Sequence, residues 1–290
     1  MTIFVNISRL YWQNREIIYN LPYMAKILNV FNKISSLRQR YFQALIGKEA
    51  LLQLISETEV AEQVYNSNAI ENSTLTLEET EKILLQIELD RYITEREIFE
   101  TKNLARVVGY IDKRAKEQEL TLKVILSLHE MLISNIREDL AGRFRSENEF
   151  VRVGSHIAPA PREVTGRLEK MLAEYNANNH ENIIKRLERL HLTFENIHPF
   201  VDGNGRIGRA INNYLLIREG FVPINIKFID RNNYYDAFKE FDANETTTIM
   251  EGMVGRALTN GYHKRLAYLE GKRIITLREF AKENKLSHPN

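Results

Sequence analysis

The sequence contains no cysteine among its 290 residues. Disulfides, thiolate metal sites and cysteine nucleophiles are therefore excluded. Only 6 prolines and 13 glycines are present, which leaves room for long helices. No apolar run approaches the ~18 residues that cross a membrane, and the first residues lack the basic and apolar segments of a secretory signal. We therefore expect a soluble, cytoplasmic protein with no membrane contact.

Positive and negative charges nearly cancel, since 40 Lys and Arg residues are balanced by 39 Asp and Glu residues and the formal net charge is +1. This balance provides no broad attraction to nucleic acid, which is therefore not an expected partner. Hydrophobic residues make up 43% of the chain, which is ordinary for a globular protein with a buried core. The length suits one large domain, or one domain with a small appendage.

Apolar residues recur at helical spacing along most of the chain, which predicts an all-α fold. The first such segment begins at a favourable helix-capping residue, Thr76, and the acids Glu78 and Glu79 follow it. One stretch alternates instead and is rich in β-forming residues, at Phe150-Val151-Arg152-Val153-Gly154. We expect a bundle of about eight to ten helices with one small β-hairpin. The predicted helices span residues 75–87, 96–115, 122–133, 161–175, 181–197, 205–218, 234–241 and 250–269.

A glycine-rich loop separates two of the predicted helices. Pro199 lacks a backbone N–H and disfavours helical geometry at His198, so the first helix should end there. The string Asp202-Gly203-Asn204-Gly205 favours a tight turn, and helical periodicity resumes directly after it. The sequence therefore predicts a turn between His198 and Arg206, with a new helix starting at its end.

The start of this second helix has the features of an anion site. Free backbone N–H groups and the positive end of the helix dipole favour a negative charge there. Gly203 and Gly205 allow a phosphate to approach the backbone closely. Arg206 and Arg209 lie three residues apart on the first turn, where two guanidiniums suit a polyphosphate tail.

Two further side chains of the loop are suited to chemistry on such an anion. Asp202 offers a hard oxygen ligand, and Mg²⁺ is commonly held by one or two carboxylates together with substrate phosphates. His198 has a side chain suited to proton abstraction near neutral pH. Each residue has an ordinary structural explanation when taken alone, so the combination carries the prediction. The spacing GxxxxGK(S/T) of a Walker-type loop is absent.

The loop resembles the signature of the Fic family, HPFx(D/E)GN(G/K)RxxR, and every specified position matches. In this chain it reads His198-Pro199-Phe200-Val201-Asp202-Gly203-Asn204-Gly205-Arg206-Ile207-Gly208-Arg209. The resemblance covers residues 67–256 and includes a hairpin, called here the flap (residues 150–157). It also includes an adenine-side segment, Arg231-Asn232-Asn233-Tyr234-Tyr235. Asp242 is a departure, because some relatives have Asn at that position.

This resemblance implies a protein adenylyltransferase, which moves AMP from ATP onto a Ser, Thr or Tyr hydroxyl of a target protein. His198 would deprotonate the hydroxyl, and Asp202 would hold Mg²⁺. The target protein would dock on the flap as an added strand. The nucleotide would be bound by Gly203, Asn204, Gly205, Arg206, Arg209, Tyr235, Val153 and Gly154.

An upstream segment, Ser67-Asn68-Ala69-Ile70-Glu71-Asn72, resembles the family's inhibitory motif (S/T)xxxE(G/N). Ser67 and Glu71 are four residues apart and therefore share a helix face. The resemblance implies that Glu71 pairs with Arg209 and takes the place of the γ-phosphate of ATP. ATP would then bind weakly or in an unproductive pose. In some relatives the equivalent glutamate instead supports the removal of AMP.

Other functions stay open on the residues alone. Fic relatives also transfer UMP, phosphate or phosphocholine, or remove AMP, but the intact pair Arg206 and Arg209 favours a triphosphate donor. The segment Leu277–Ser287 resembles the first helix and turn of a helix-turn-helix, which would indicate a DNA-binding regulator. A net charge near zero opposes that function. The sequence also leaves a homodimer open.

We expect three parts along the chain: an N-terminal helical segment at residues 1–60, a Fic domain at residues 61–270, and the start of a helix-turn-helix at residues 271–290. That last part either stops short at Asn290 or is an accidental likeness. The inhibitory helix should lie near residues 58–72. The N-terminal segment is expected to pack on the Fic domain through Tyr11, Trp12, Ile17, Leu28, Phe31 and Leu45.

Overall fold

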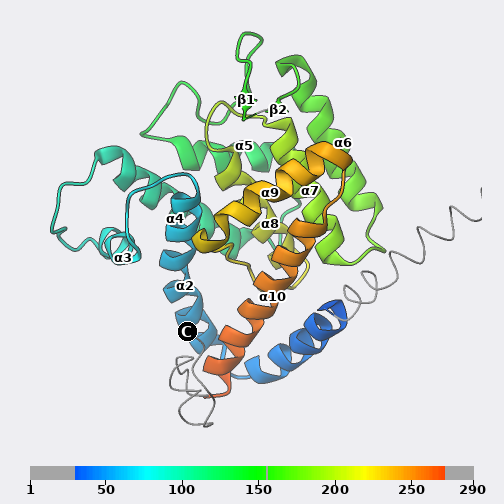
Figure 1. Ribbon diagram of the computed structural model, residues 1–290. Helices are drawn as coiled ribbons and strands as arrows, with labels where there is room; N and C mark the ends of the chain where they lie inside the picture. Colours follow the sequence, from blue (N-terminus) through cyan, green and yellow to red (C-terminus); the bar gives the residue numbers. More distant parts are fainter. Residues whose placement is uncertain (1–29, 155, 272–290) are drawn as a thin grey trace, which may run out of the picture.

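The computed structural model describes residues 30–154 and 156–271, and in these ranges the protein is a helical bundle with one small hairpin (Figure 1). Residues 30–45 are helical, and the further α-helices are α2 to α10, so ten occur in the described part. The predicted all-α class with a single hairpin is confirmed. The elements are α2 Glu49–Ile70, α3 Leu77–Leu85, α4 Glu95–Arg114, α5 Leu122–Ile133, β1 Arg152–Val153, β2 His156–Ile157, η1 Pro161–Glu163, α6 Val164–Ala177, α7 Ile183–Ile197, α8 Asn204–Arg218, η2 Phe228–Asp230, α9 Arg231–Asn244 and α10 Thr248–Leu269.

Helix α8 runs through the centre of the bundle and is surrounded by α4, α5 and α7 (Figure 1). Its apolar side chains Ile207, Ile211, Tyr214 and Leu216 are fully buried. Phe194 on α7 is fully buried as well, and both helices belong to one continuous core. Burial of this kind fixes the start of α8 rigidly, because well-packed interiors allow little movement. The polar groups of its first turn therefore have a firm base.

The N-terminal helix at residues 30–45 packs on this core, as predicted. Ile34, Leu37 and Tyr41 are buried, and the ring of Tyr41 contacts the ring of Tyr262 on α10 edge to face. Phe31 and Leu45 are partly buried against the same core. Helix α2 runs without a break across the domain boundary predicted after residue 60. The other predicted contacts, Tyr11, Trp12, Ile17 and Leu28, lie outside the described residues.

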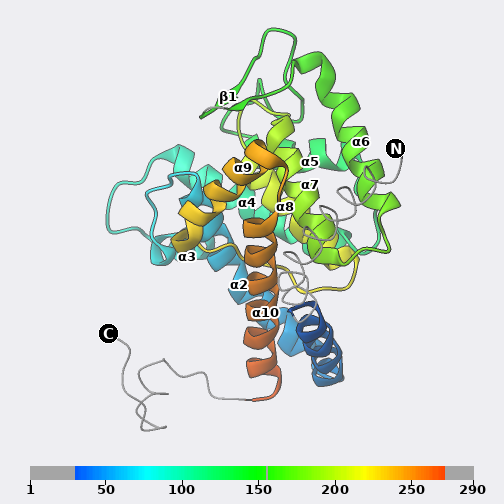
Figure 2. The ribbon, with the colours of Figure 1, turned by 45° about the vertical axis from the view of Figure 1, so that its right-hand side comes forward.

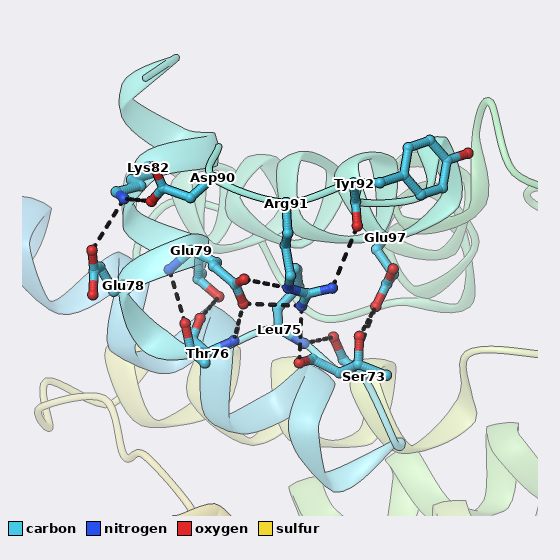
Figure 3. A network of polar contacts seen from close by, with 12 residues as sticks. Ser73, Leu75, Thr76, Glu78, Glu79, Lys82, Asp90, Arg91, Tyr92 and Glu97 are labelled. Carbon is cyan, nitrogen blue, oxygen red and sulfur yellow. Dashed lines mark hydrogen bonds and ion pairs between the residues drawn. The ribbon is translucent and has the colours of Figure 1, made fainter. Parts of the chain in front are cut away.

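Helix α3 and the chain around it form a small unit that projects from the side of the bundle (Figure 1, Figure 2). Thr76 caps α3, as the sequence predicted, and it forms a reciprocal capping box with Glu79. Arg91 donates to both carboxylate oxygens of Glu79, at 2.5 and 3.1 Å, and to the carbonyl of Thr74 (Figure 3). Thr74 also donates to Glu97 of α4 at 2.6 Å. The unit therefore ties the end of α2 to the start of α4.

Two sequence predictions concern membranes and the C-terminus. Within the described ranges, no helix combines the length and the apolar composition needed to span a bilayer. The predicted start of a helix-turn-helix at residues 271–290 falls almost entirely outside the described residues.

Candidate active site

The loop between α7 and α8 folds as its sequence predicts. Helix α7 ends at His198, which adopts the left-handed conformation with φ 48°. Gly203 has φ 85°, and a Cβ there would lie 3.1 Å from Leu132, so this position requires glycine. The Asn204 side chain closes the loop, since it accepts from the N–H of Phe200 and donates to its carbonyl, both at 2.9 Å. No side chain caps the start of α8, which leaves its first N–H groups for an anion.

His129 of α5 packs against the loop and bonds to it. Its ring stacks on Phe200 with 3.7 Å between centroids and 4° between planes. Nδ1 accepts from the N–H of Gly142 at 3.2 Å, so Nε2 carries the hydrogen and donates to the carbonyl of Asp202 at 3.0 Å. Burial lowers the pKa of His129 to about 4, so the ring is neutral at pH 7. His129 therefore fixes the loop as a neutral hydrogen-bonding group.

His198 lies at the lip of the loop with its ring largely covered. Nδ1 is 3.3 Å from the carbonyl of Glu195, which places the hydrogen on Nδ1 and leaves Nε2 as the acceptor. Burial lowers the pKa of His198 to about 4, so the ring is neutral at pH 7 and Nε2 carries no hydrogen. Arg145 donates to the carbonyl of His198 at 2.8 Å and to the carbonyl of Pro159 at 2.8 Å, and thus holds the helix end against the base of the flap.

Arg206 and Asp202 form a charged group with two residues of α4. Arg206 donates to Asp202 at 3.1 Å and lies 3.4 Å from Glu100. Arg96 donates to the other Asp202 oxygen at 3.1 Å and to Glu100 at 3.1 Å. The Arg206 side chain is 5% exposed, whereas that of Arg96 is 58% exposed. The Asp202 carboxylate is thus held at the loop by one buried and one solvent-facing arginine.

Arg209 is bound to the segment that the sequence identified as inhibitory. Its guanidinium donates to the hydroxyl and the carbonyl of Ser67 at 3.0 and 2.8 Å, to Glu71 at 2.8 Å, and to the hydroxyl of Tyr234 at 3.1 Å. A Cβ on Gly205 would overlap the Glu71 carboxylate, so this carboxylate lies directly against the first turn of α8. The structure therefore brings Ser67 and Glu71 together with Arg209.

The flap is a two-stranded antiparallel hairpin in which Arg152 pairs with Ile157 and Val153 with His156. Val153 is 44% exposed. The ring of His156 bonds to the carbonyl of Asn196 on α7 at 2.8 Å, which anchors the flap beside the loop. Asp242, where some relatives have Asn, accepts from Asn196 at 3.1 Å.

The predicted adenine-side residues surround the end of α2. Tyr235 donates to the carbonyl of Ile70 at 3.2 Å, and Arg231 donates to Asn72 at 2.7 Å. Gly154 of the flap has φ 60°, which favours glycine. Nucleotide contacts of Tyr235, Val153 and Gly154 stay predictions.

A cavity of about 630 Å³ lies on another face of α8, between α2 and α4. Ser67, Arg206 and Arg209 contribute to its wall, but no residue from 198 to 205 does. The cavity is therefore next to the loop without being part of it. The described residues also contain no group of three or more His, Asp or Glu side chains that could hold a metal ion by itself.

Sequence reasoning missed several residues that shape the site, namely His129, Arg145, Glu195 and Arg96. Arg145 precedes the flap in the sequence, and its burial at 4% exposure is the feature that marks it. Glu195 lies three residues before His198, a spacing that puts both side chains on one side of the helix end. That spacing was readable in the sequence. The contacts of His129 and Arg96 with Asp202 span 73 and 106 residues, and no local signal indicates them.

Comparison with known proteins identifies the family of this site. Residues 119–216 match the model of the Fic/DOC family. The chain is 31% identical over 218 residues to a protein adenylyltransferase Fic of Nematostella vectensis and 30% identical over 223 residues to one of Drosophila ananassae. Both matches cover 71% of this chain but only 49% and 44% of the relatives, so the chain spans about half of their length.

Solved structures agree on the fold. A Fic domain-containing signalling protein of Bacteroides thetaiotaomicron superposes with a TM-score of 0.75 at 23% identity, over 84% of this chain and 99% of that one. Fic-1 of C. elegans superposes with a TM-score of 0.75 at 21% identity, over 92% of this chain and 79% of the other. At these identities the likeness establishes the architecture alone.

Proposed function

The chain belongs to the Fic/DOC family, and we propose that it is a protein adenylyltransferase that is inhibited by its own Glu71. The observation that carries the proposal is the first turn of α8. Two arginines, Arg206 and Arg209, are nearly buried there beside uncapped N–H groups, and a carboxylate already occupies the anion position. The names of the relatives, protein adenylyltransferase Fic, support the same activity.

In the proposed reaction, ATP binds with its phosphates over the N-terminus of α8. The backbone N–H groups of residues 203–205 would face the phosphates, and Arg206 and Arg209 would bind their β and γ groups. A hydroxyl of the target attacks the α-phosphorus, the bond to the β-phosphate breaks, and pyrophosphate leaves. Nε2 of His198 takes the hydroxyl proton, which its neutral state at pH 7 permits. Alignment and charge stabilisation would supply the catalysis.

Asp202 fits the role of a Mg²⁺ ligand that the family resemblance implies. Its carboxylate is a hard oxygen donor beside the proposed phosphate position. The two arginines that donate to it show that it attracts positive charge. Because one carboxylate stands alone, the ion would need phosphate oxygens and water as its other ligands, as is common for Mg²⁺. When bound, it would neutralise charge on the phosphates. Arg96 would have to leave one Asp202 oxygen for this.

Inhibition follows from competition for Arg209. The Glu71 carboxylate and a γ-phosphate are both anions that need the same guanidinium and the same space above Gly205. Ser67 binds Arg209 at two more points and so holds the end of α2 on it. ATP could then enter only if the Glu71 side chain moved. The flap would present the target hydroxyl, with strand addition to β1 or β2 as the binding mode.

The test is AMP transfer from ATP labelled at the α-phosphate, in the presence of Mg²⁺. We expect weak labelling by the natural protein, strong labelling of itself or of added proteins by Glu71→Gly, and none by Glu71→Gly combined with His198→Ala. ATP labelled only at the γ-phosphate is the control, and it should give no labelled protein. Label from the γ position would instead indicate phosphate transfer. Absence of labelling by Glu71→Gly from either position would contradict the proposed function.

A further inference from the structure

Glu195 is a buried carboxyl group that the proposed reaction does not use. It lies in the last turn of α7, its side chain is 10% exposed, and its Oε1 has no hydrogen-bond partner among the described residues. Its Oε2 is 4.0 Å from Nδ1 of His198. Burial, followed by the nearby charge of Glu71, raises the pKa of Glu195 to about 8. A carboxyl kept in such surroundings is costly, which suggests a role beyond packing.

His191, one helical turn earlier, also has an unpaired buried atom. The ring is completely buried, and its Nδ1 has no partner in the described part of the chain. A Cβ on Gly208 of α8 would overlap Oε1 of Glu195 and would lie 3.2 Å from Nδ1 of His191. The two unpaired atoms therefore flank the same glycine. Residues four apart on a helix are neighbours, so a small side-chain rotation joins them.

The hydrogen-bond donors can be assigned along this row of groups. A guanidinium only donates, so the Tyr234 hydroxyl accepts from Arg209 at 3.1 Å. The single hydrogen of that hydroxyl is then available to Nε2 of His191, which is 2.9 Å away. Burial lowers the pKa of His191 to about 3, so the ring is neutral and its own hydrogen is on Nδ1. Nδ1–H is thus a donor beside Gly208, the same glycine that borders the unpaired acceptor Oε1 of Glu195.

We propose that Tyr234, His191 and Glu195 form a buried polar relay from Arg209 to His198, and that Glu195 is a positioning residue for His198. The inference rests on the proposed role of His198 as the base. The relay fixes the Glu195 carboxyl beside the His198 ring, whose Nδ1 hydrogen is directed at the backbone carbonyl of Glu195. Nε2 then stays free to accept a proton. In the proposed function, Arg209 exchanges its partner Glu71 for a phosphate of ATP. The relay therefore connects this exchange with His198, the proposed base.

Gly208 leaves the space that the Glu195 carboxyl occupies. Any side chain on it would displace the Glu195 carboxyl, although no catalytic group would be removed. Gly208→Ala therefore perturbs the relay by position alone. Gly166→Ala on α6 is the matched control, because a Cβ there meets no atom within 4 Å.

The experiment compares variants in the Glu71→Gly background. Glu195→Leu and Gly208→Ala should each lower kcat about 10-fold, with the KM for ATP unchanged, since a misplaced base slows the chemical step. Glu195→Gln should recover most of kcat, because its amide oxygen can still accept from His191. Nitrogen NMR of the His198 ring should report the Nδ1–H form in the parent and a mixture of both neutral forms in Glu195→Leu and Gly208→Ala. Gly166→Ala should match the parent in both measurements.

Unchanged kcat and an unchanged His198 ring in both disruptive variants would overturn the relay, as would an effect on KM alone. If the Glu71→Gly parent transfers no AMP, the proposed function fails, but the NMR comparison still decides the relay. If Glu195→Leu does not fold, Gly208→Ala and Glu195→Gln provide the same comparison.

Discussion

Replacing Glu71 by glycine should raise the affinity for ATP, because it removes the anion that holds Arg209. Among the described residues, Glu71 is the one carboxylate paired with that guanidinium, at 2.8 Å, and the side chains of Arg209 and Glu71 are 8% and 33% exposed. Arg209 keeps Ser67 and Tyr234 as partners after the change. The site should therefore stay folded while its anion position becomes free.

The size of the effect follows from the contact that ATP must replace. A hydrogen bond between charged groups contributes about 1.5–3 kcal/mol net, and the partial exposure of Glu71 places this contact in the lower part of that range. Each ~1.4 kcal/mol corresponds to a tenfold change in affinity, so binding should tighten about 10- to 40-fold. Overlap between the carboxylate and the space above Gly205 adds a steric contribution of the same sign.

Titration calorimetry with Mg²⁺ and a non-hydrolysable ATP analogue measures this change directly. Removing any negative charge favours an anion slightly, so Glu88→Gly is the control, since Glu88 is exposed and distant in sequence from the loop. The control should bind as the natural protein does. If Glu71→Gly tightens binding no more than Glu88→Gly does, Glu71 does not compete with the nucleotide, and the contact between Glu71 and Arg209 does not lower the affinity for ATP.

Three further predictions concern stability. Gly203→Ala should lower the free energy of unfolding in urea by about 1–3 kcal/mol, because φ is 85° and the new Cβ would crowd Leu132, whereas Gly166→Ala should cause no loss. Glu195→Gln should remove a pH dependence of stability, because the folded pKa of Glu195 is about 8, above that of the unfolded chain. The Glu195 carboxyl therefore favours folding at low pH and loses this contribution as pH rises from about 4.5 to 8. The free energies of unfolding at pH 5 and pH 8 should differ less in the variant than in the natural protein. Arg91→Ala should lower the free energy of unfolding only slightly, because Arg91 is 45% exposed. It should speed amide hydrogen exchange around α3 and leave exchange in α8 unchanged; protection lost in α8 would show a wider role.

Local sequence chemistry predicted the elements that depend on neighbours along the chain. Thr76 and Glu79 form their capping box within three residues, so the start of α3 was readable. The same holds for the end of α7 before Pro199 and for the tight turn at Gly203, where backbone geometry dictates the residue. The charge pair between Glu71 and Arg209 spans 138 residues, and only the resemblance to a family indicated it.

The remaining features depend on packing between distant segments, which a single sequence does not encode in any local pattern. Arg145 looks like an ordinary charged residue of a loop, yet its guanidinium bonds carbonyls 14 and 53 residues away. The phosphate contact predicted for Asn204 stays a prediction, and its side chain bonds the N–H and the carbonyl of Phe200 within the loop. A polar side chain in a turn can serve a ligand or the turn itself, and the loop geometry alone decides which.

The two arginines of α8 are restrained from two directions. Arg209 is held by Glu71 at the end of α2, whereas Arg206 and Asp202 are held by Arg96 and Glu100 at the start of α4. The chain between these helix ends is the α3 unit, which is fastened to both by its polar network (Figure 3). A shift of the end of α2 that withdraws Glu71 would therefore strain contacts of this unit. Because the same unit adjoins Arg96, withdrawal of Glu71 from Arg209 and release of Asp202 for Mg²⁺ should be coupled steps, so a variant that loosens the unit should strengthen nucleotide and metal binding together.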